Sequence, residues 1–416
     1  MSPAVRARHR IRWEFGLCAV ALVLAPLGAN AELWLIESSL NSGFESNDNL
    51  ALAQASPGRV NTLSLSTSLN ASRQLENSVT RMKADITALR EHGPGAENRI
   101  DAQLALTKSL SDPLNSVDFA LQYSQDFNNV VKNADVTLEQ GQRRTTLLSA
   151  AWSHALSERL SANTRLSVNQ TRYGQQLSGA VDYRDSAASA GLSYGLTETT
   201  TMGLQTSYST YRPVDNNNES KTSRAGMSVS RVLSDRTNGS VNFGGYRTVT
   251  TASSASLACP LAAAYCNAGY VPFVIVTESN ASSLRGLEVG ASLRYQFNET
   301  TDSALGVARQ QVPSGAGTLV RSDTVSAALN RSFSPTLAGA MNVERSRSAF
   351  QKSTNAAQPG RSTFSLSLTK QLATDLSLQT RFQRSRSDDS ALGNNARSNS
   401  LSVSLKYDGP RIDSSR

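Results

Sequence analysis

The residue types that could perform chemistry are few in this chain. Histidine occurs three times, at His9, His92 and His154. A hydrolase needs a nucleophile with a base beside it, and only His92 stands next to an acid, Glu91. We expect His92 to be a solvated loop residue. No phosphate loop, metal motif or basic nucleic-acid patch is present, so the sequence predicts no enzyme, no metal, no cofactor and no nucleic-acid partner.

The cysteines point to a structural role. Cys18 lies in the N-terminal apolar segment, whereas Cys259 and Cys266 lie close together in a polar, alanine-rich stretch. In an exported protein, two nearby cysteines usually pair. We therefore predict a Cys259–Cys266 disulfide that holds a loop, with free thiols or a metal pair as the alternatives.

The first 31 residues have the organisation of a signal peptide. Arg6, Arg8, Arg10 and Arg12 precede an apolar stretch from Phe15 to Leu27, and Ala29-Asn30-Ala31 matches a cleavage site. We expect the chain to leave the cytoplasm, with residues 1–31 removed and residues 32–416 forming the mature protein. Only 39% of residues are hydrophobic and no later apolar run could span a bilayer as a helix, which argues against ordinary soluble domains.

A short pattern recurs eight times along the mature chain. An alternating segment ends in a cation or aromatic residue, any residue, and then Leu or Phe, and a polar turn such as Ser111-Asp112-Pro113 follows. Such turn residues bond to the local backbone or preset its conformation. The repeats are separated by 35 to 46 residues, apart from one gap of 64 that contains the two cysteines. Each repeat is therefore read as a hairpin.

The segments beside these turns alternate with period 2. Leu63, Leu65 and Leu69 lie on one face, and Ser64 and Ser68 lie on the other. Long alternating strands, with short turns at one end and longer loops at the other, are typical of outer-membrane barrels. Because backbone groups in lipid must be bonded internally, such a sheet must close. The alternatives are a soluble β-sandwich, with shorter strands and an aromatic core, and a β-solenoid, with a shorter repeat.

Counting the hairpins predicts an all-β, antiparallel, up-and-down transmembrane β-barrel of about 18 strands. The first strand is expected near residues 33–47 and the last near 396–407. Both termini then lie on the short-turn side, which is expected to be periplasmic. Longer extracellular loops are expected near residues 48–59, 91–99, 129–141, 174–182, 213–220, 252–282, 312–317, 351–360 and 388–395.

The repeated cation or aromatic residue falls on the lipid-facing register near the short turns. Tyrosine suits a membrane interface, and arginine or lysine can extend to headgroups. We predict a periplasmic interface ring, with a specific lipid-binding ring as the alternative. Its members are Arg73, Lys108, His154, Tyr194, Arg231, Tyr295, Arg331, Lys370 and Tyr407.

The opposite register is rich in Ser, Thr, Asn and Gln with scattered charges. A barrel of this size is wide enough for an aqueous lumen, and such a lining suits a hydrated polar solute, although any wet pore is lined in this way. Charged residues could tune ion selectivity. The charged candidates for the lumen are Arg81, Lys83, Asp85, Asp118, Asp126, Arg165, Arg224, Arg294, Glu344 and Arg381.

The loop at residues 252–282 is the largest insert. It contains the two cysteines and an apolar run at residues 270–276. Because such a loop is poorly suited to water, we expect it either to fold into the barrel mouth as a constriction or to pack over the outer rim.

The opening of the mature chain resembles a known family. Gly43-Phe44-Glu45-Ser46-Asn47-Asp48-Asn49-Leu50 is followed by a loop and a regular array of alternating hairpins. This is similar to the opening of the β-barrel porins associated with exopolysaccharide operons. The specific motif covers about eight residues, and the rest of the likeness is general barrel pattern. Unlike many such barrels, which end on an aromatic residue, this chain continues past Tyr407 to Arg416.

The resemblance implies an outer-membrane conduit for exopolysaccharide biosynthesis and export. Its partners would be outer-membrane lipid, the barrel-assembly machinery, and possible polysaccharide and export components. A diffusion porin, general or solute-specific, and a closed barrel that scaffolds a synthesis complex are the alternatives. Fold alone does not distinguish them.

Overall fold

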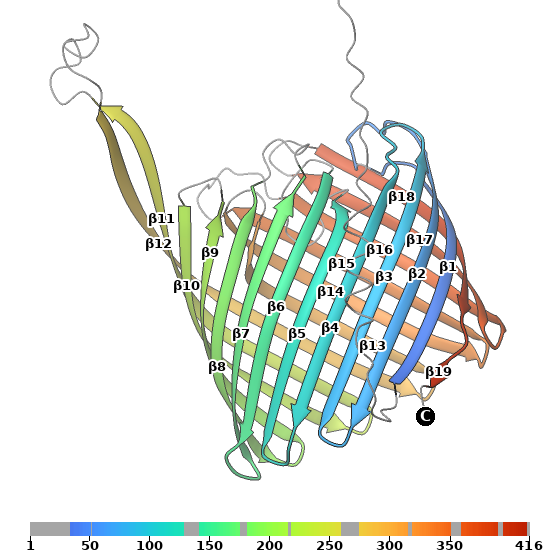
Figure 1. The fold of residues 1–416 in the computed structure, drawn as a ribbon, viewed down its shortest axis with the longest axis horizontal. Helices are drawn as coiled ribbons and strands as arrows, with labels where there is room; N and C mark the ends of the chain where they lie inside the picture. Colours follow the sequence, from blue (N-terminus) through green and yellow to red (C-terminus); the bar gives the residue numbers. More distant parts are fainter. Residues whose placement is uncertain are drawn as a thin grey trace, which may run out of the picture.

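The computed structural model describes residues 34–50, 52–128, 141–174, 181–214, 218–258, 274–314, 318–350, 359–389 and 394–413. These residues form one antiparallel sheet that closes on itself into a barrel (Figure 1). The predicted signal peptide, the 31 residues at the N-terminus, lies outside the described residues. No helix in the described segments is both long and apolar enough to cross a membrane.

The strands follow one another around the barrel in chain order. The first nine are β1 (Trp34–Asn47), β2 (Val60–Leu75), β3 (Ser78–His92), β4 (Arg99–Ser111), β5 (Asn115–Asn128), β6 (Gly141–Ala155), β7 (Leu160–Tyr173), β8 (Tyr183–Thr197) and β9 (Thr200–Pro213). The next nine are β10 (Asn218–Ser234), β11 (Thr237–Ala258), β12 (Val274–Asn298), β13 (Thr301–Pro313), β14 (Leu319–Ser334), β15 (Leu337–Phe350), β16 (Pro359–Ala373), β17 (Leu376–Asp389) and β18 (Asn394–Asp408).

The barrel closes where the first strand meets the last. β1 pairs with β2 on one side and with β18 on the other, in a register that sets Leu40 opposite Tyr407. A two-residue strand, β19 (Ile412–Asp413), continues along β1 beyond the end of β18. The predicted 18-strand, closed, antiparallel, all-β barrel is therefore confirmed. β1 begins and β18 ends at the end of the barrel that carries the short turns (Figure 1).

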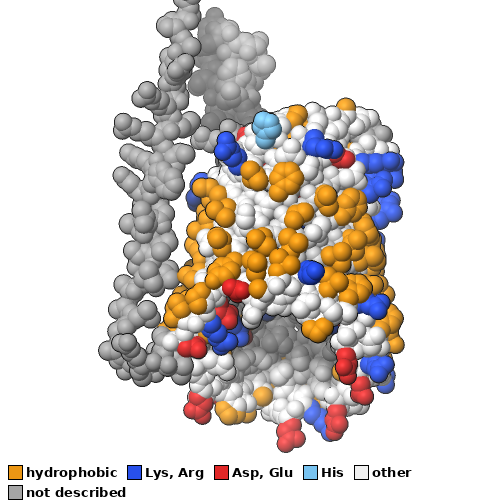
Figure 2. Space-filling view, turned by 90° about the vertical axis from the view of Figure 1, so that its right-hand side faces the viewer, with side chains coloured by type: hydrophobic (Ala, Val, Ile, Leu, Met, Phe, Trp, Pro, Cys, Tyr) orange, Lys and Arg blue, Asp and Glu red, His pale blue; other side chains and the backbone are white. Residues whose placement is uncertain are grey.

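The two faces of the wall differ as the alternation predicts. Large apolar side chains that point outward are well exposed, including Leu65, Leu166 and Leu204 at 53%, 60% and 61%. Inward neighbours such as Ser64 and Ser66 are partly covered. In Figure 2 apolar side chains cover much of the middle of the wall, and charged side chains gather toward its ends. An outward-facing apolar band of this kind is typical of barrels that span the outer membrane.

The short turns are held by local polar contacts. Asp112, between β4 and β5, accepts hydrogen bonds from the backbone N–H groups of Leu114 (2.8 Å) and Asn115 (2.7 Å). These bonds, with a further one from the Asn115 side chain, lower the pKa of Asp112 below its usual value. Because the folded pKa is lowered, the turn keeps this contribution at neutral pH and loses it only when the pH falls through that pKa.

Candidate pore and its lining

The inward register carries the polar lining of a possible pore. Antiparallel partners point to the same side of a sheet, so the strand partner of each residue defines the face on which it lies. Ser64, Ser66 and Ser68 on β2 stand opposite Leu89, Thr87 and Asp85 on β3. The structure places all ten charged lumen candidates on this inward register: Arg81, Lys83, Asp85, Asp118, Asp126, Arg165, Arg224, Arg294, Glu344 and Arg381.

Further charged residues share the inward face but were not singled out from the sequence as lumen candidates. The same alternation identifies them, because each is an even number of residues from an assigned inward position on its strand. They are Glu37, Glu45, Glu91, Arg99, Asp101, Arg143, Asp185, Glu288, Asp302, Arg361 and Lys406. The lumen therefore contains acids and bases in comparable numbers.

Many of the inward charges meet a partner of opposite sign. Asp126 Oδ2 lies 2.8 Å from Arg143 Nη2. Glu288 Oε1 on β12 lies 3.0 Å from Arg224 Nε on β10, with β11 between the two strands. Such pairs cancel much of each other's field within a few ångströms. The lining therefore presents polar groups with little net charge.

Hydroxyl groups bond to one another across neighbouring strands. Thr87 Oγ1 donates to Ser66 Oγ at 2.9 Å, and the hydroxyl oxygens of Ser240 and Ser292 lie 2.8 Å apart. Hydroxyls both donate and accept, so they can exchange these bonds for bonds to water or to a polar solute. The arrangement suits a wet channel.

The end of β13, with Ser314 directly after it, and the start of β14 fold inward at the loop end of the barrel, and Ser314, Leu319 and Val320 are called the hairpin tip below. Tyr211 on β9 donates a hydrogen bond from its hydroxyl to the backbone oxygen of Ser314 at 2.7 Å. β9 and β13 are four strand intervals apart, roughly 19 Å along the wall. A direct contact over this separation requires the hairpin tip to lie inside the barrel.

An aromatic cluster on the inner wall packs against this tip. Leu319 at the start of β14 packs with Tyr183 and Tyr211, and Tyr173 lies against them. The ring centroids of Tyr183 and Tyr211 are 5.2 Å apart. Val320, beside Leu319, is fully buried. The hairpin tip is therefore docked against the inner wall and occupies part of the loop-side mouth.

Among the described residues, the segment that folds into the mouth is the hairpin tip of β13 and β14. The sequence pointed to residues 252–282, but β11 and β12 continue through much of that range and pair with each other as far as Ala258 and Val274. In Figure 1 this hairpin projects away from the barrel mouth. Cys259 and Cys266 lie outside the described residues. In the sequence, the signal for this contact is the row of aromatic residues Tyr173, Tyr183 and Tyr211 on the inward register.

The proposed interface ring lies on the outward register near the short turns. Tyr194 and Tyr407 are each 45% exposed there, and His154 stacks on Trp152 with ring centroids 5.7 Å apart. Arg331 lies over the Phe333 ring at 5.3 Å. The same register holds all nine members: Arg73, Lys108, His154, Tyr194, Arg231, Tyr295, Arg331, Lys370 and Tyr407. Their role as membrane anchors stays a prediction.

The motif at the first strand forms the seam of the barrel. Asp48 accepts hydrogen bonds from the backbone N–H and side-chain amide of Asn399 on β18, both at 2.7 Å. Asn49 is 3% exposed, and its amide donates to the backbone oxygens of Ala53 (2.7 Å) and Arg397 (2.9 Å). These residues therefore join the two ends of the sheet at its loop side.

The one sequence candidate for a catalytic pair is not assembled. Glu91 points inward and forms an ion pair with Arg99, while His92 follows at the end of β3 on the opposite face. Within the described residues no group of three or more His, Cys, Asp or Glu side chains could hold a metal ion.

A closed barrel with a polar lumen and an apolar outer wall defines the chain as a transmembrane β-barrel of the outer-membrane type. No protein-family model matches the sequence, and no curated protein matches it. Solved structures with a similar fold include OccAB3 of Acinetobacter baumannii, at 9% identity and a TM-score of 0.46 over 91% of this chain and 99% of that one.

Two other structures show a comparable level of similarity. OpdL of Pseudomonas aeruginosa is 13% identical, with a TM-score of 0.43 over 91% of this chain and 99% of that one. The ferric-catecholate import receptor Fiu of E. coli K12, in its open form, is 10% identical, with a TM-score of 0.46 over 89% of this chain and 81% of that one.

Proposed function

We propose that this protein is an outer-membrane channel for a hydrated polar solute, and that its cargo is an exopolysaccharide on its way out of the cell. The observation that carries the channel function is the inward face, where hydroxyls, amides and paired charges line the wall. A neutral or weakly charged glycan exchanges hydrogen bonds with such a lining at little cost.

The choice of cargo rests on the resemblance of the opening segment to porins of exopolysaccharide operons. In the structure Asp48 and Asn49 of that segment bond across the seam to β18. In this barrel the described contacts of these two residues hold the wall closed, and none of them would select a glycan.

A diffusion porin is the second candidate. The β13–β14 tip, held by Tyr211 and packed on Tyr183, occupies part of the mouth. A docked segment at this position limits the size of solutes that pass, as a sieve for small molecules requires.

Two measurements separate these functions. In planar bilayers the purified barrel should conduct, and the exopolysaccharide of the native bacterium, added to one side, should interrupt the current more strongly as its chain length increases. Deleting the gene should stop surface polysaccharide and leave small-solute uptake nearly unchanged. Lost uptake with normal surface polysaccharide would establish the diffusion porin, and absence of any conductance would overturn both channel functions.

A further inference from the structure

The outward face of the barrel is strongly basic at its loop end. Among the outward-facing residues of the described strands, the acids are Glu219, Asp323 and Asp388. Basic residues on the same face lie in the loop-side half of most strands. They are Arg90, Arg144, Arg172, Arg184, Arg212, Lys221, Arg247, Arg285, Arg309, Arg345, Arg347, Arg384, Arg386 and Arg397.

These outward cations are almost all arginine. At the short-turn end the corresponding ring mixes lysine, arginine, histidine and tyrosine, which suits simple anchoring at an interface. Arginine presents a planar fork of N–H donors that binds phosphate oxygens in pairs, whereas lysine acts as a point charge. The composition at the loop end therefore favours phosphate groups as the ligand.

The cations are most concentrated across β15–β18. Arg345 pairs with Ser362, Ser362 with Arg386, and Arg386 with Arg397, which places three arginines in one cross-strand row. Arg347 stands opposite Gly360. The small residues on β16 leave room between the arginines of β15 and β17, which are two strand spacings apart, roughly 10 Å.

Local acids neutralise only part of this surface. Arg386 Nε lies 2.7 Å from Asp388 Oδ1, and Arg309 Nε lies 2.7 Å from Asp323 Oδ1. Within the described residues, Arg345, Arg347 and Arg397 are exposed and make no ion pair. Several guanidinium groups are therefore available to an external anion.

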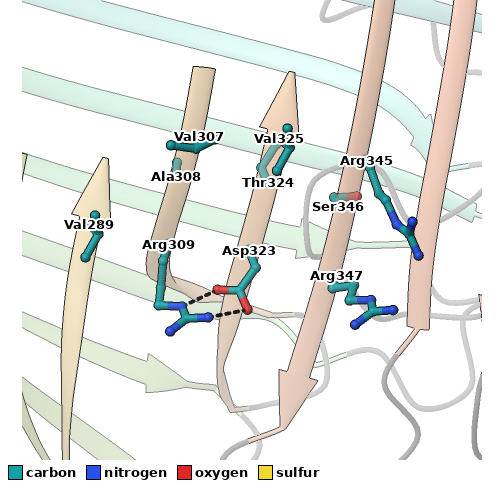
Figure 3. Close-up of a pocket in the computed structure, with 10 residues that line it drawn as sticks. All are labelled: Val289, Val307, Ala308, Arg309, Asp323, Thr324, Val325, Arg345, Ser346 and Arg347. Carbon is teal, nitrogen blue, oxygen red and sulfur yellow. Dashed lines mark hydrogen bonds and ion pairs between the residues drawn. The ribbon is translucent and has the colours of Figure 1, made fainter. Parts of the chain in front are cut away.

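An open groove of about 590 Å³ adjoins Arg345 and Arg347 on the outer wall. Figure 3 shows Val289, Val307 and Val325 beside it, together with Arg309, which is bonded to Asp323, and with Arg345 and Arg347. Apolar and cationic residues thus line the same groove. An amphiphile with an acyl chain and a phosphorylated headgroup would match both kinds of lining.

We propose that this loop-side arginine surface, formed by Arg345, Arg347, Arg386 and Arg397, is a binding site for a phosphorylated glycolipid of the outer leaflet. The phosphates bind the guanidinium groups, and an acyl chain lies against Val307 and Val325. More than one phosphate is required to span the row from β15 to β18, which distinguishes this ligand from a phospholipid with a single phosphate. The proposal depends on the transmembrane barrel and is independent of the cargo.

The test uses the full barrel in detergent, titrated with bisphosphorylated lipid A and followed by native mass spectrometry. One variant carries Arg345→Gln, Arg347→Gln, Arg386→Gln and Arg397→Gln. The matched control removes four cations at the short-turn end through Lys108→Gln, Arg231→Gln, Arg331→Gln and Lys370→Gln. Loss of about tenfold in affinity is expected for the loop-side variant, while the control binds as the wild type does. Both must keep the heat-dependent gel migration of a folded barrel.

Two further titrations make the assignment specific. Dephosphorylated lipid A and phosphatidylglycerol should each bind the wild type more weakly than bisphosphorylated lipid A. Replacing the same four arginines by lysine should give intermediate affinity, because charge is kept and the paired donors are lost. Equal binding of phosphatidylglycerol, or an equal loss in the short-turn control, would overturn the site.

Discussion

Asp48 and Asn399 show how single residues close the barrel. The Asp48 carboxylate accepts two hydrogen bonds at 2.7 Å from Asn399, across the only seam between the first and last long strands. Hydrogen bonds to a charged group contribute about 1.5–3 kcal/mol. We predict that Asp48→Ala lowers the free energy of unfolding by about this amount, measured by denaturant titration of the refolded barrel. Ser42→Ala, outward on β1, should leave the free energy of unfolding unchanged, and equal effects of the two substitutions would contradict the role of the seam.

Tyr211 holds the tip of the β13–β14 hairpin through one hydroxyl. Its ring is 2% exposed, and its hydroxyl bonds to the backbone oxygen of Ser314. Tyr211→Phe keeps the ring but leaves that buried oxygen without this donor, at a cost of about 1–3 kcal/mol. We predict more frequent openings to a larger single-channel current in planar bilayers.

The matched control for Tyr211 lies on the same strand. Tyr208 is outward and 47% exposed, so Tyr208→Phe should give the current of the wild type. A Tyr211→Phe current indistinguishable from both would show that the hydroxyl does not hold the tip.

At this scale the sequence predicts the face of a residue but not its distant partner. Alternation alone places Tyr183 and Tyr211 on the inward face. The contact between Tyr211 and Ser314 joins residues that are 103 positions apart and depends on how one hairpin bends. Local periodicity contains no information about that bend.

Among the elements, the β11–β12 hairpin is the one that extends beyond the barrel wall. β10 pairs with β11 only as far as Ala252, and β13 pairs with β12 only from Val289 onward. We predict that replacing residues 253–279 with a two-residue Asn-Gly turn leaves the folded barrel and its current intact. Gel migration with and without heating and single-channel recording would measure this, and a failure to fold would show that the hairpin stabilises the wall.

The same element allows a test of the predicted disulfide. Because the hairpin projects away from the mouth (Figure 1), reduction of a Cys259–Cys266 bond should not change the wild-type current. A rise in current on adding dithiothreitol would mean that this segment gates the pore. Sequence reasoning identified the insert from its length and cysteines, but it could not see that both flanks continue as paired strands, since they lack the short-turn signature.

For the whole molecule, the closed barrel could be predicted because its signals are local and repeated. Eight turns mark the hairpins, and period-2 alternation marks the two faces, so strand number and closure follow from counting and from the need to bond every backbone group in lipid. The narrowed mouth and the arginine surface could not be predicted from such repeated local signals. They depend on tilt, register and the packing of distant strands, which only the assembled sheet defines.

The ion selectivity of the pore depends on where the charges lie in the barrel, and the net charge of the chain alone would predict it wrongly. The chain has a formal net charge of +8, which suggests an anion-selective pore. In the structure, however, the excess arginines face outward, and inward charges such as Asp126 and Arg143 are paired at 2.8 Å. At physiological ionic strength fields are screened over about 8 Å, so outward charges contribute little within the lumen.

We therefore predict weak ion selectivity. In a tenfold KCl gradient, the zero-current potential should be a small fraction of the roughly 59 mV that ideal selectivity gives. Removing either charge of one inward pair should shift the zero-current potential. Asp126→Asn should shift it toward anion selectivity, and Arg143→Gln toward cation selectivity. Strong anion selectivity in the wild type, with both variants unchanged, would mean that the outward arginines control permeation and that the paired lining does not.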